Sequence, residues 1–161
     1  MRKYFVLCLI VFLAGMALAQ NKYERAAKDF SYGGIKIGMS KAQVKAKCPK
    51  VEFLVEPAGG GWPELRNGNF ELDDATKIHL DFDINWKVYE IVVTLTEMGL
   101  FEKGGVAGFA LSLGKKLGDP TKVVERYSAQ WTFRSVSRQI VFVMESRALY
   151  INSKESLFDP D

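Results

Sequence analysis

The sequence contains one histidine, His79, which alternates with the aspartates Asp81 and Asp83. Side chains two residues apart on a strand point to the same face, so these three could lie together. Imidazole and carboxylate groups bind divalent metals, which makes the three residues a candidate metal site of a small exported hydrolase. Because alternate residues of a strand lie about 6.6 Å apart, one strand alone rarely closes a coordination shell. We therefore expect no metal and interpret the stripe as the solvated face of an antiparallel strand.

Cys48 offers a second candidate chemistry, as a thiol nucleophile with His79 as its base. Its predicted position is near the C-terminal end of a helix, where the helix dipole disfavours a thiolate. We expect a small, partly buried apolar side chain instead. No serine stands in a Gly-x-Ser-x-Gly motif. The sequence thus predicts no catalytic residue and no cofactor, and a thiol hydrolase using Cys48 remains the alternative.

Three tryptophans, Trp62, Trp86 and Trp131, are the candidate contact residues for a protein partner. Trp62 lies in the glycine- and proline-rich segment 57–63, which predicts a loop. Loops often carry binding residues, and a tryptophan can serve as a rigid apolar anchor. The alternative is a surface loop without a partner. We place Trp86 in a two-residue turn and Trp131 on a strand.

Local signals agree on a helix that begins at Ser40. Ser40 and Gln43 have the spacing of a capping box, and Met39 and Val44 that of a hydrophobic staple. Pro49 ends this helix. A second, longer helix is predicted over 106–117 from apolar residues at helical spacing, followed by Gly118.

Alternating and β-branched residues predict the strands. We expect them over 51–55, 69–72, 76–84 and 87–96 in the first half and over 121–127, 130–134, 138–145 and 148–152 in the second. Strand runs that follow single helices predict an α+β fold, with two helix-plus-antiparallel-sheet units and the helices packed on one face of the sheet. Residues 20–161 would form one domain, with repeat halves at 31–98 and 104–152.

Residues 1–19 have the form of a secretory signal peptide, with Arg2 and Lys3 before an apolar run and small residues up to Ala19. Cleavage there predicts a periplasmic or secreted protein; an uncleaved anchor is the alternative. Without Arg2 and Lys3, the 22 lysines and arginines fall to 20 against 19 acidic residues, a net charge of +1. This charge offers no argument for nucleic-acid binding. Only Cys48 would remain, so an intramolecular disulfide is not expected.

The segment Ile37-Gly38-Met39-Ser40-Lys41-Ala42-Gln43-Val44 resembles the opening motif of the small outer-membrane-assembly lipoproteins (the SmpA/OmlA group) and the repeat unit of the β-lactamase inhibitory protein fold. Leu117-Gly118-Asp119-Pro120 and Trp131 resemble later positions of such units. The resemblance implies a helix-plus-sheet fold and non-enzymatic protein binding. Two departures are Lys47-Cys48-Pro49, where the first unit would have its glycine, and Met16, where a lipoprotein would have its cysteine.

We therefore predict an exported, non-catalytic protein-binding or envelope-assembly accessory domain, which includes an inhibitor-like role. Its partner would be an envelope or secreted protein. The lysines at the two predicted helix ends are expected to be solvated. The alternative is that they contact acidic lipid, and the protein itself is expected to carry no lipid anchor. The competing class is a small exported hydrolase that uses His79 with Asp81 and Asp83, or Cys48.

Overall fold

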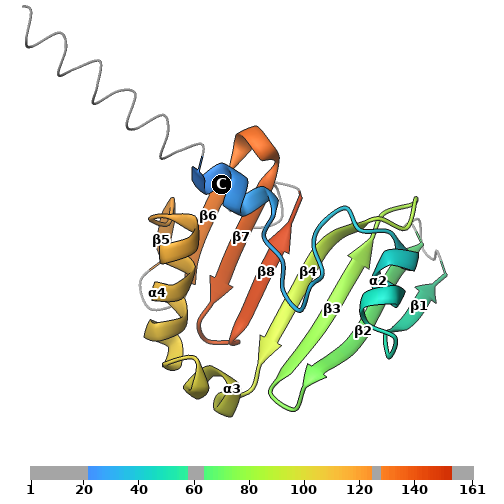
Figure 1. The fold of residues 1–161 in the computed structure, drawn as a ribbon, viewed down its shortest axis with the longest axis horizontal. Coiled ribbons are helices and arrows are strands. Elements are labelled where there is room, and N and C mark those ends of the chain that lie inside the picture. The colour runs from blue at the N-terminus through green and yellow to red at the C-terminus, as the bar shows by residue number, and fades with distance from the viewer. Residues whose placement is uncertain (1–21, 58–63, 125–127, 154–161) are drawn as a thin grey trace, which may run out of the picture.

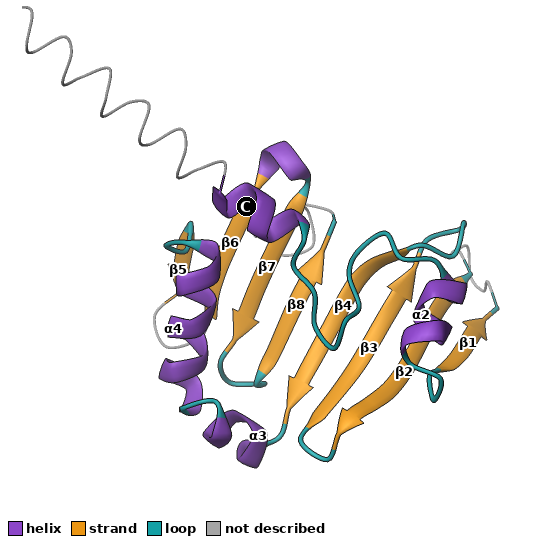
Figure 2. Cartoon of the chain, in the orientation of Figure 1, coloured by secondary structure: helices purple, strands orange, loops and turns teal. Residues whose placement is uncertain are grey.

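The computed structural model describes residues 22–57, 64–124 and 128–153. The predicted signal peptide and Trp62 lie outside the described residues. Strands dominate the structure, as Figure 2 shows. The fold is therefore mixed, as predicted, but mostly sheet. In the part of the chain that the structure describes, we find no helix long and apolar enough to cross a membrane.

All eight strands belong to one antiparallel sheet with the order β1-β2-β3-β4-β8-β7-β6-β5 (Figure 1). The strands are β1 (Glu52–Glu56), β2 (Leu65–Asp73), β3 (Thr76–Phe82), β4 (Val88–Leu95), β5 (Lys122–Val124), β6 (Ser128–Phe133), β7 (Arg138–Val143) and β8 (Ala148–Asn152). Each half of the chain contributes four strands that follow one another in the sheet, and the two halves join where β4 pairs with β8. The two outer strands of the sheet are thus β1 and β5.

The helices are α2 (Lys41–Lys47), α3 (Glu97–Glu102) and α4 (Gly105–Leu117), with a 3₁₀ turn at Arg134–Val136 and a helical segment over residues 22–28. The predicted capping box is confirmed. The Ser40 hydroxyl accepts from the backbone N–H of Gln43 at 3.3 Å, and the Gln43 side chain accepts from the N–H of Ser40 at 2.8 Å. Gly118 ends α4 at φ 81°, a conformation that glycine adopts without strain.

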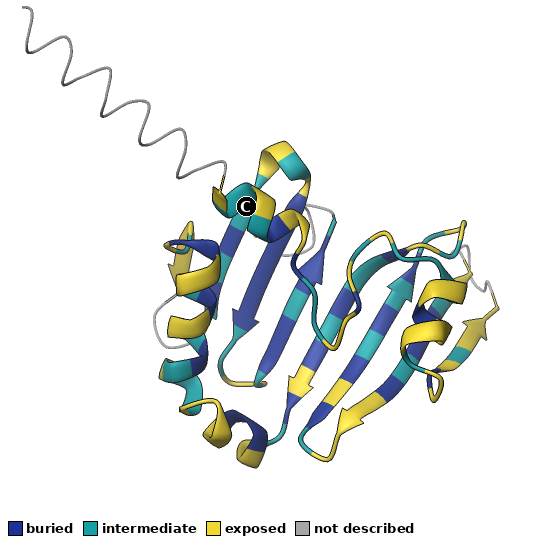
Figure 3. Cartoon of the chain, viewed as in Figure 1, coloured by how far each residue is buried: buried dark blue, intermediate teal, exposed yellow. Residues whose placement is uncertain are grey.

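One face of the sheet is apolar across both halves, because alternate residues of paired strands point the same way. Its buried members from β2 to β8 are Phe70, Ile78, Leu80, Phe82, Ile91, Val93, Leu95, Leu149, Ile151, Ile140, Phe142, Ala129 and Trp131. We call this side the core face and the opposite side the open face. Figure 3 shows that burial is greatest on β7 and β8, whereas the outer strand β1 is mostly exposed.

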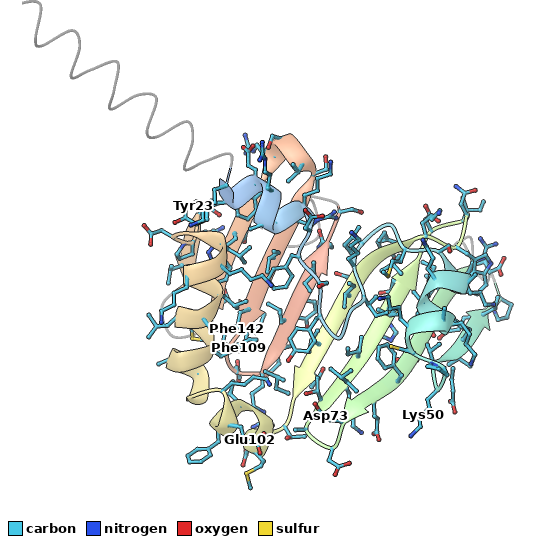
Figure 4. All side chains as sticks on the ribbon, in the orientation of Figure 1. Tyr23, Lys50, Asp73, Glu102, Phe109 and Phe142 are labelled. Carbon is cyan, nitrogen blue, oxygen red and sulfur yellow. The ribbon has the colours of Figure 1, made fainter. Side chains whose placement is uncertain are left out.

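Helix α4 packs against the second half of the core face. The ring of Phe109 meets the ring of Phe142 on β7 edge-on, with centroids 4.8 Å apart (Figure 4). The indole N–H of Trp131 on β6 donates to the carbonyl of Gly118 at 2.8 Å. These contacts hold α4 against β6 and β7.

The segment between the two strand runs contains the short helix α3. Thr96 is its N-cap, and its hydroxyl accepts from the N–H of Gly99 at 3.2 Å. Gly99 packs so closely on Ala75 that an added Cβ would lie 2.7 Å from the Ala75 Cβ. Close packing on the β2–β3 turn therefore selects glycine at this position.

Candidate functional site

Polar side chains cross the open face in one line from β2 to β7. Each member is directly opposite the next in the strand register, so all point to the same side. This polar row consists of Asn67 on β2, Asp81 on β3, Glu90 on β4, Asn152 on β8 and Gln139 on β7. The strand register therefore gathers side chains that are far apart in the sequence.

Several members of the polar row are buried although they lie on the open face. Asn67 is 6% exposed and Gln139 is 1% exposed. The side-chain oxygens Asn67 Oδ1 and Gln139 Oε1 have no hydrogen-bond partner among the described residues. An unsatisfied buried acceptor costs about 1–3 kcal/mol, so most native proteins leave few of them. These two oxygens mark places where a donor from outside the described chain would fit.

His79 lies beside the polar row and uses both ring nitrogens. Its Nδ1 is 2.7 Å from Asn69 Oδ1, and its Nε2 is 3.2 Å from Asp81 Oδ1. Both partners accept hydrogen bonds, so both contacts are satisfied together when the imidazole is doubly protonated. The hydrogen bond to Asp81 is the main reason that the pKa of His79 is raised; burial lowers it, and the charges of Asp81, Glu90 and Glu56 raise it further.

Glu90 stands next to Asp81 in the register and is half-buried. Its pKa is raised, first because burial disfavours the charged carboxylate and second because of the negative charge of Asp81. A hydrogen bond from Asn152 acts in the opposite direction. The centre of the polar row is therefore a pair of carboxyl groups that repel each other when both are ionised.

The predicted grouping of His79, Asp81 and Asp83 is only half realised. His79 and Asp81 are in contact, but β3 ends at Phe82 and Asp83 belongs to the following turn. There the Asp83 carboxylate accepts from the backbone N–H groups of Asn85 and Lys87 at 2.9 and 2.8 Å. The described residues contain no cluster of three or more His, Cys, Asp or Glu side chains placed to hold a metal ion.

Cys48 and His79 lie on opposite sides of the sheet. Cys48 follows α2 as its C-cap and packs against the hydrophobic core, whereas His79 points to the open face. Burial raises the pKa of the Cys48 thiol, and the nearby charge of Lys47 lowers it by less. The pair proposed from the sequence as thiol and base is therefore not brought together.

The tryptophans have different surroundings. Trp131 is 1% exposed and its N–H is used inside the core, so its ring is not offered to a partner. Trp86 lies in the turn between β3 and β4, with a φ of 55°, and its ring packs against the rings of Phe53 and Phe82. The ammonium of Lys41 lies 3.8 Å from the centre of the Trp86 ring, and the Arg66 guanidinium lies 5.6 Å from it. The Trp86 ring thus has two cationic groups close to it.

A hollow of about 630 Å³ lies beside the β2–β3 turn. Its charged lining includes Lys50 and Asp73, which are labelled in Figure 4, together with Glu71 and Lys77. Glu71 and Lys77 already form an ion pair at 3.2 Å. The lining also includes Glu52 and Asp74, so four carboxylates stand against two lysines and the hollow carries a net negative charge.

The outer strand β1 is a second unusual surface. Its side chains Leu54 and Val55 are exposed, and Leu65 on β2 is exposed beside Leu54 on the open face. The carboxylates of Glu52 and Glu56 flank Leu54 on this face. The sequence reasoning identified this strand but not its position at the edge of the sheet.

The polar row was not predicted from the sequence. Glu90 and Gln139 are polar residues in largely apolar strands, which was the available signal, whereas Asn67 lies in a mostly polar strand. Their meeting depends on which strands pair and in which register. Neither is encoded in the local pattern of one strand.

The fold belongs to the class of α+β proteins built on a single antiparallel sheet. A crystal structure of a DUF4309 family protein (YjgB) from Bacillus subtilis is similar to it, with a TM-score of 0.51 over 84% of this chain and 95% of that chain. The two sequences are 16% identical, so the likeness concerns the fold alone. No protein-family model matches the sequence, and no curated protein matches it either.

Proposed function

We propose that this protein is an exported, non-catalytic domain that binds an extended segment of an envelope or secreted protein at strand β1. The observation that carries the proposal is the exposure of apolar side chains at this edge: Leu54 on β1 and Leu65 on β2 are each 51% exposed. Exposed apolar side chains that adjoin one another often mark interaction sites.

The backbone of β1 supports binding by strand addition. Within the described residues, β1 pairs with β2 on one side and faces no further strand on the other. Such an edge presents unpaired N–H and C=O groups that an extended peptide can use. The opposite edge, β5, covers only Lys122–Val124. The five-residue edge of β1 therefore offers the longer template.

The charges of β1 select the kind of partner. Glu52 and Glu56 flank Leu54 on the open face, so an added strand would place two of its side chains near carboxylates. A second copy of β1 in antiparallel register would set Glu52 against Glu56, which is unfavourable. We therefore propose a partner segment with an apolar residue between basic residues.

We also propose that the chain contains two related helix-plus-sheet units with helices on one face, as in the SmpA/OmlA and β-lactamase inhibitory protein folds that the sequence resembles. In support, each half contributes one helix and four strands, and the strand order mirrors itself about the β4–β8 pair. Buried Val44 of α2 and Phe109 of α4 belong to the same core. Export is supported by the form of residues 1–19.

Site-specific photo-cross-linking tests the binding proposal. A photoreactive residue at position 54 is compared with one at position 111 on α4, which is exposed to a similar degree, 67%. We expect position 54 alone to cross-link a defined extended segment rich in lysine or arginine, and the double variant Glu52→Lys/Glu56→Lys to lose it. Identical products from both positions, or an acidic cross-linked segment, would contradict the proposal.

The alternative function is a small hydrolase that uses His79, and the contact between His79 and Asp81 is the observation in its favour. Both His79 nitrogens already have partners in the chain, which leaves neither directed at a substrate. Metal analysis of the purified protein, with the cellular phenotype of His79→Ala and Cys48→Ala, separates the two classes. Full retention of the phenotype by both variants would exclude the hydrolase.

A further inference from the structure

The first part of the polar row, Asn67, Asp81 and Glu90, has the geometry of a small binding site. The three residues are consecutive neighbours across β2, β3 and β4 and point to the open face. Neighbouring strands lie about 4.8 Å apart, so Asp81 lies roughly this far from each of the other two. Their side chains therefore line a continuous span of about 10 Å.

Among Asn67, Asp81 and Glu90, the buried polar atom that lacks a partner in the described residues is an acceptor, Asn67 Oδ1. The side-chain NH2 group of Asn67 donates to Glu56 Oε1 at 3.3 Å, so the side-chain oxygen of Asn67 points away from Glu56. This buried oxygen has no donor among the described residues. It lies beside the carboxylate of Asp81 in the register. A ligand that donates hydrogen bonds would satisfy it.

The span also carries negative charge that the chain leaves largely uncompensated. The charges of Glu56, Asp81 and Glu90 all act on His79, and among the described residues His79 forms an ion pair with Asp81. The ion pairs of lysine and arginine there use other carboxylates, namely Asp29, Glu64, Glu71 and Glu97. The span therefore carries more negative than positive charge.

We propose that Asn67, Asp81 and Glu90 bind an organic cation, a guanidinium or a primary ammonium group. Such a group carries several donors and no acceptor, which matches two carboxylates and an amide oxygen. A calcium ion would need six to eight oxygens within about 2.6 Å, a closer arrangement than groups spread over three strands provide. This site adjoins the β1 edge, because Asn67 lies opposite Leu54 and its amide donates to Glu56. Asp81 and Glu90 lie on strands that do not pair with β1.

The cation could be a free small molecule or an arginine or lysine side chain of a peptide. Titration followed by NMR amide shifts and calorimetry uses three probes: agmatine, N-acetyl-arginine amide, and a short extended peptide with one arginine. We expect saturable binding centred on β2, β3 and β4. Equal affinity for all three probes identifies a free small cation, and tighter binding of the peptide identifies a protein side chain; both results support the site.

Matched variants test the residues. Asp81→Asn and Asn67→Leu should each weaken binding roughly tenfold, since each removes one acceptor for a charged donor. Asn67→Leu removes a buried oxygen that has no hydrogen-bond partner in the described residues, so we expect this variant to fold. The control Glu71→Gln removes a charge from the same face, four residues from Asn67 along β2 or about 13 Å. It should bind as the unaltered protein does.

Three results would overturn the proposal: no saturable binding, an equal loss in Glu71→Gln, or equal binding of the uncharged analogue N-acetyl-citrulline amide. Calcium binding that shifts the backbone amide signals of β2, β3 and β4, with no binding of the arginine probes, would overturn the proposal too. Asp81→Asn changes a residue of β3, which does not pair with β1, and should leave cross-linking from position 54 intact. Failure of the cation site is therefore distinguishable from failure of the proposed partner at β1.

Discussion

Replacement of Trp131 by phenylalanine should destabilise the domain strongly. Trp131 is 1% exposed, and its indole N–H donates to the carbonyl of Gly118 at 2.8 Å. The variant leaves that carbonyl without this donor, which costs about 1–3 kcal/mol. The smaller ring also leaves a cavity of roughly 40 Å³, worth about 1 kcal/mol at 24 cal/mol per Å³. We therefore expect a total loss of about 2–4 kcal/mol.

Urea unfolding followed by far-ultraviolet circular dichroism measures this loss. With a slope of about 2 kcal/mol per molar urea, the midpoint should fall by roughly 1–2 M. The matched control is Trp86→Phe, which weakens the cation–π contact with Lys41 and should cost about 0.5–2 kcal/mol. A loss below about 0.5 kcal/mol in Trp131→Phe, or a loss smaller than that of the control, would refute the assignment of Trp131 to the core.

Three further predictions concern Glu90, Gly99 on α3 and Gly114 on α4. Because the folded-state pKa of Glu90 is raised, its protonation favours folding at low pH, and that contribution is lost as the pH rises through the raised pKa. Glutamine does not titrate, so the free energy of unfolding of Glu90→Gln relative to the unaltered protein should increase as the pH is raised from 4 to 7 in urea titrations. A difference in free energy that stays constant with pH would contradict the cause assigned to the pKa of Glu90. Gly99→Ala should lower the free energy of unfolding by about 1–3 kcal/mol, because its Cβ would meet Ala75. Gly114→Ala, where nothing lies within 4 Å, should raise it by up to about 1 kcal/mol in the same assay.

Local sequence patterns predicted most of the elements. The capping residues Ser40 and Gln43 placed the start of α2 correctly, since both contacts form within four residues of the chain. Alternation placed β3 and β4 within two residues of their observed ends. The strand β2 begins at Leu65, earlier than expected, because its polar and glycine positions pair across β1 and β3. Tertiary pairing there extends a strand beyond its apolar segment.

Predictions of the site were less successful because they required knowledge of distance in space. The alternation of His79, Asp81 and Asp83 suggested one group, but the strand ends before Asp83, whose carboxylate accepts from the turn backbone. Cys48 and His79 were paired by chemistry alone, and the sheet separates them. A side chain's residue type shows what it could do, whereas its partners depend on the fold.

The sequence alone therefore determined the local structure: a capped helix at Ser40, a longer helix ended by Gly118 and two runs of antiparallel strands. These features follow from short-range hydrogen bonds and from the period of apolar residues, both readable along the chain. Tertiary structure alone decided that β4 pairs with β8, that β1 lies at an edge and that Asn67, Asp81 and Glu90 stand in line. The physical reason is that strand order and register are set by burial of the whole core face, to which no single segment contributes enough apolar area to choose its own neighbour.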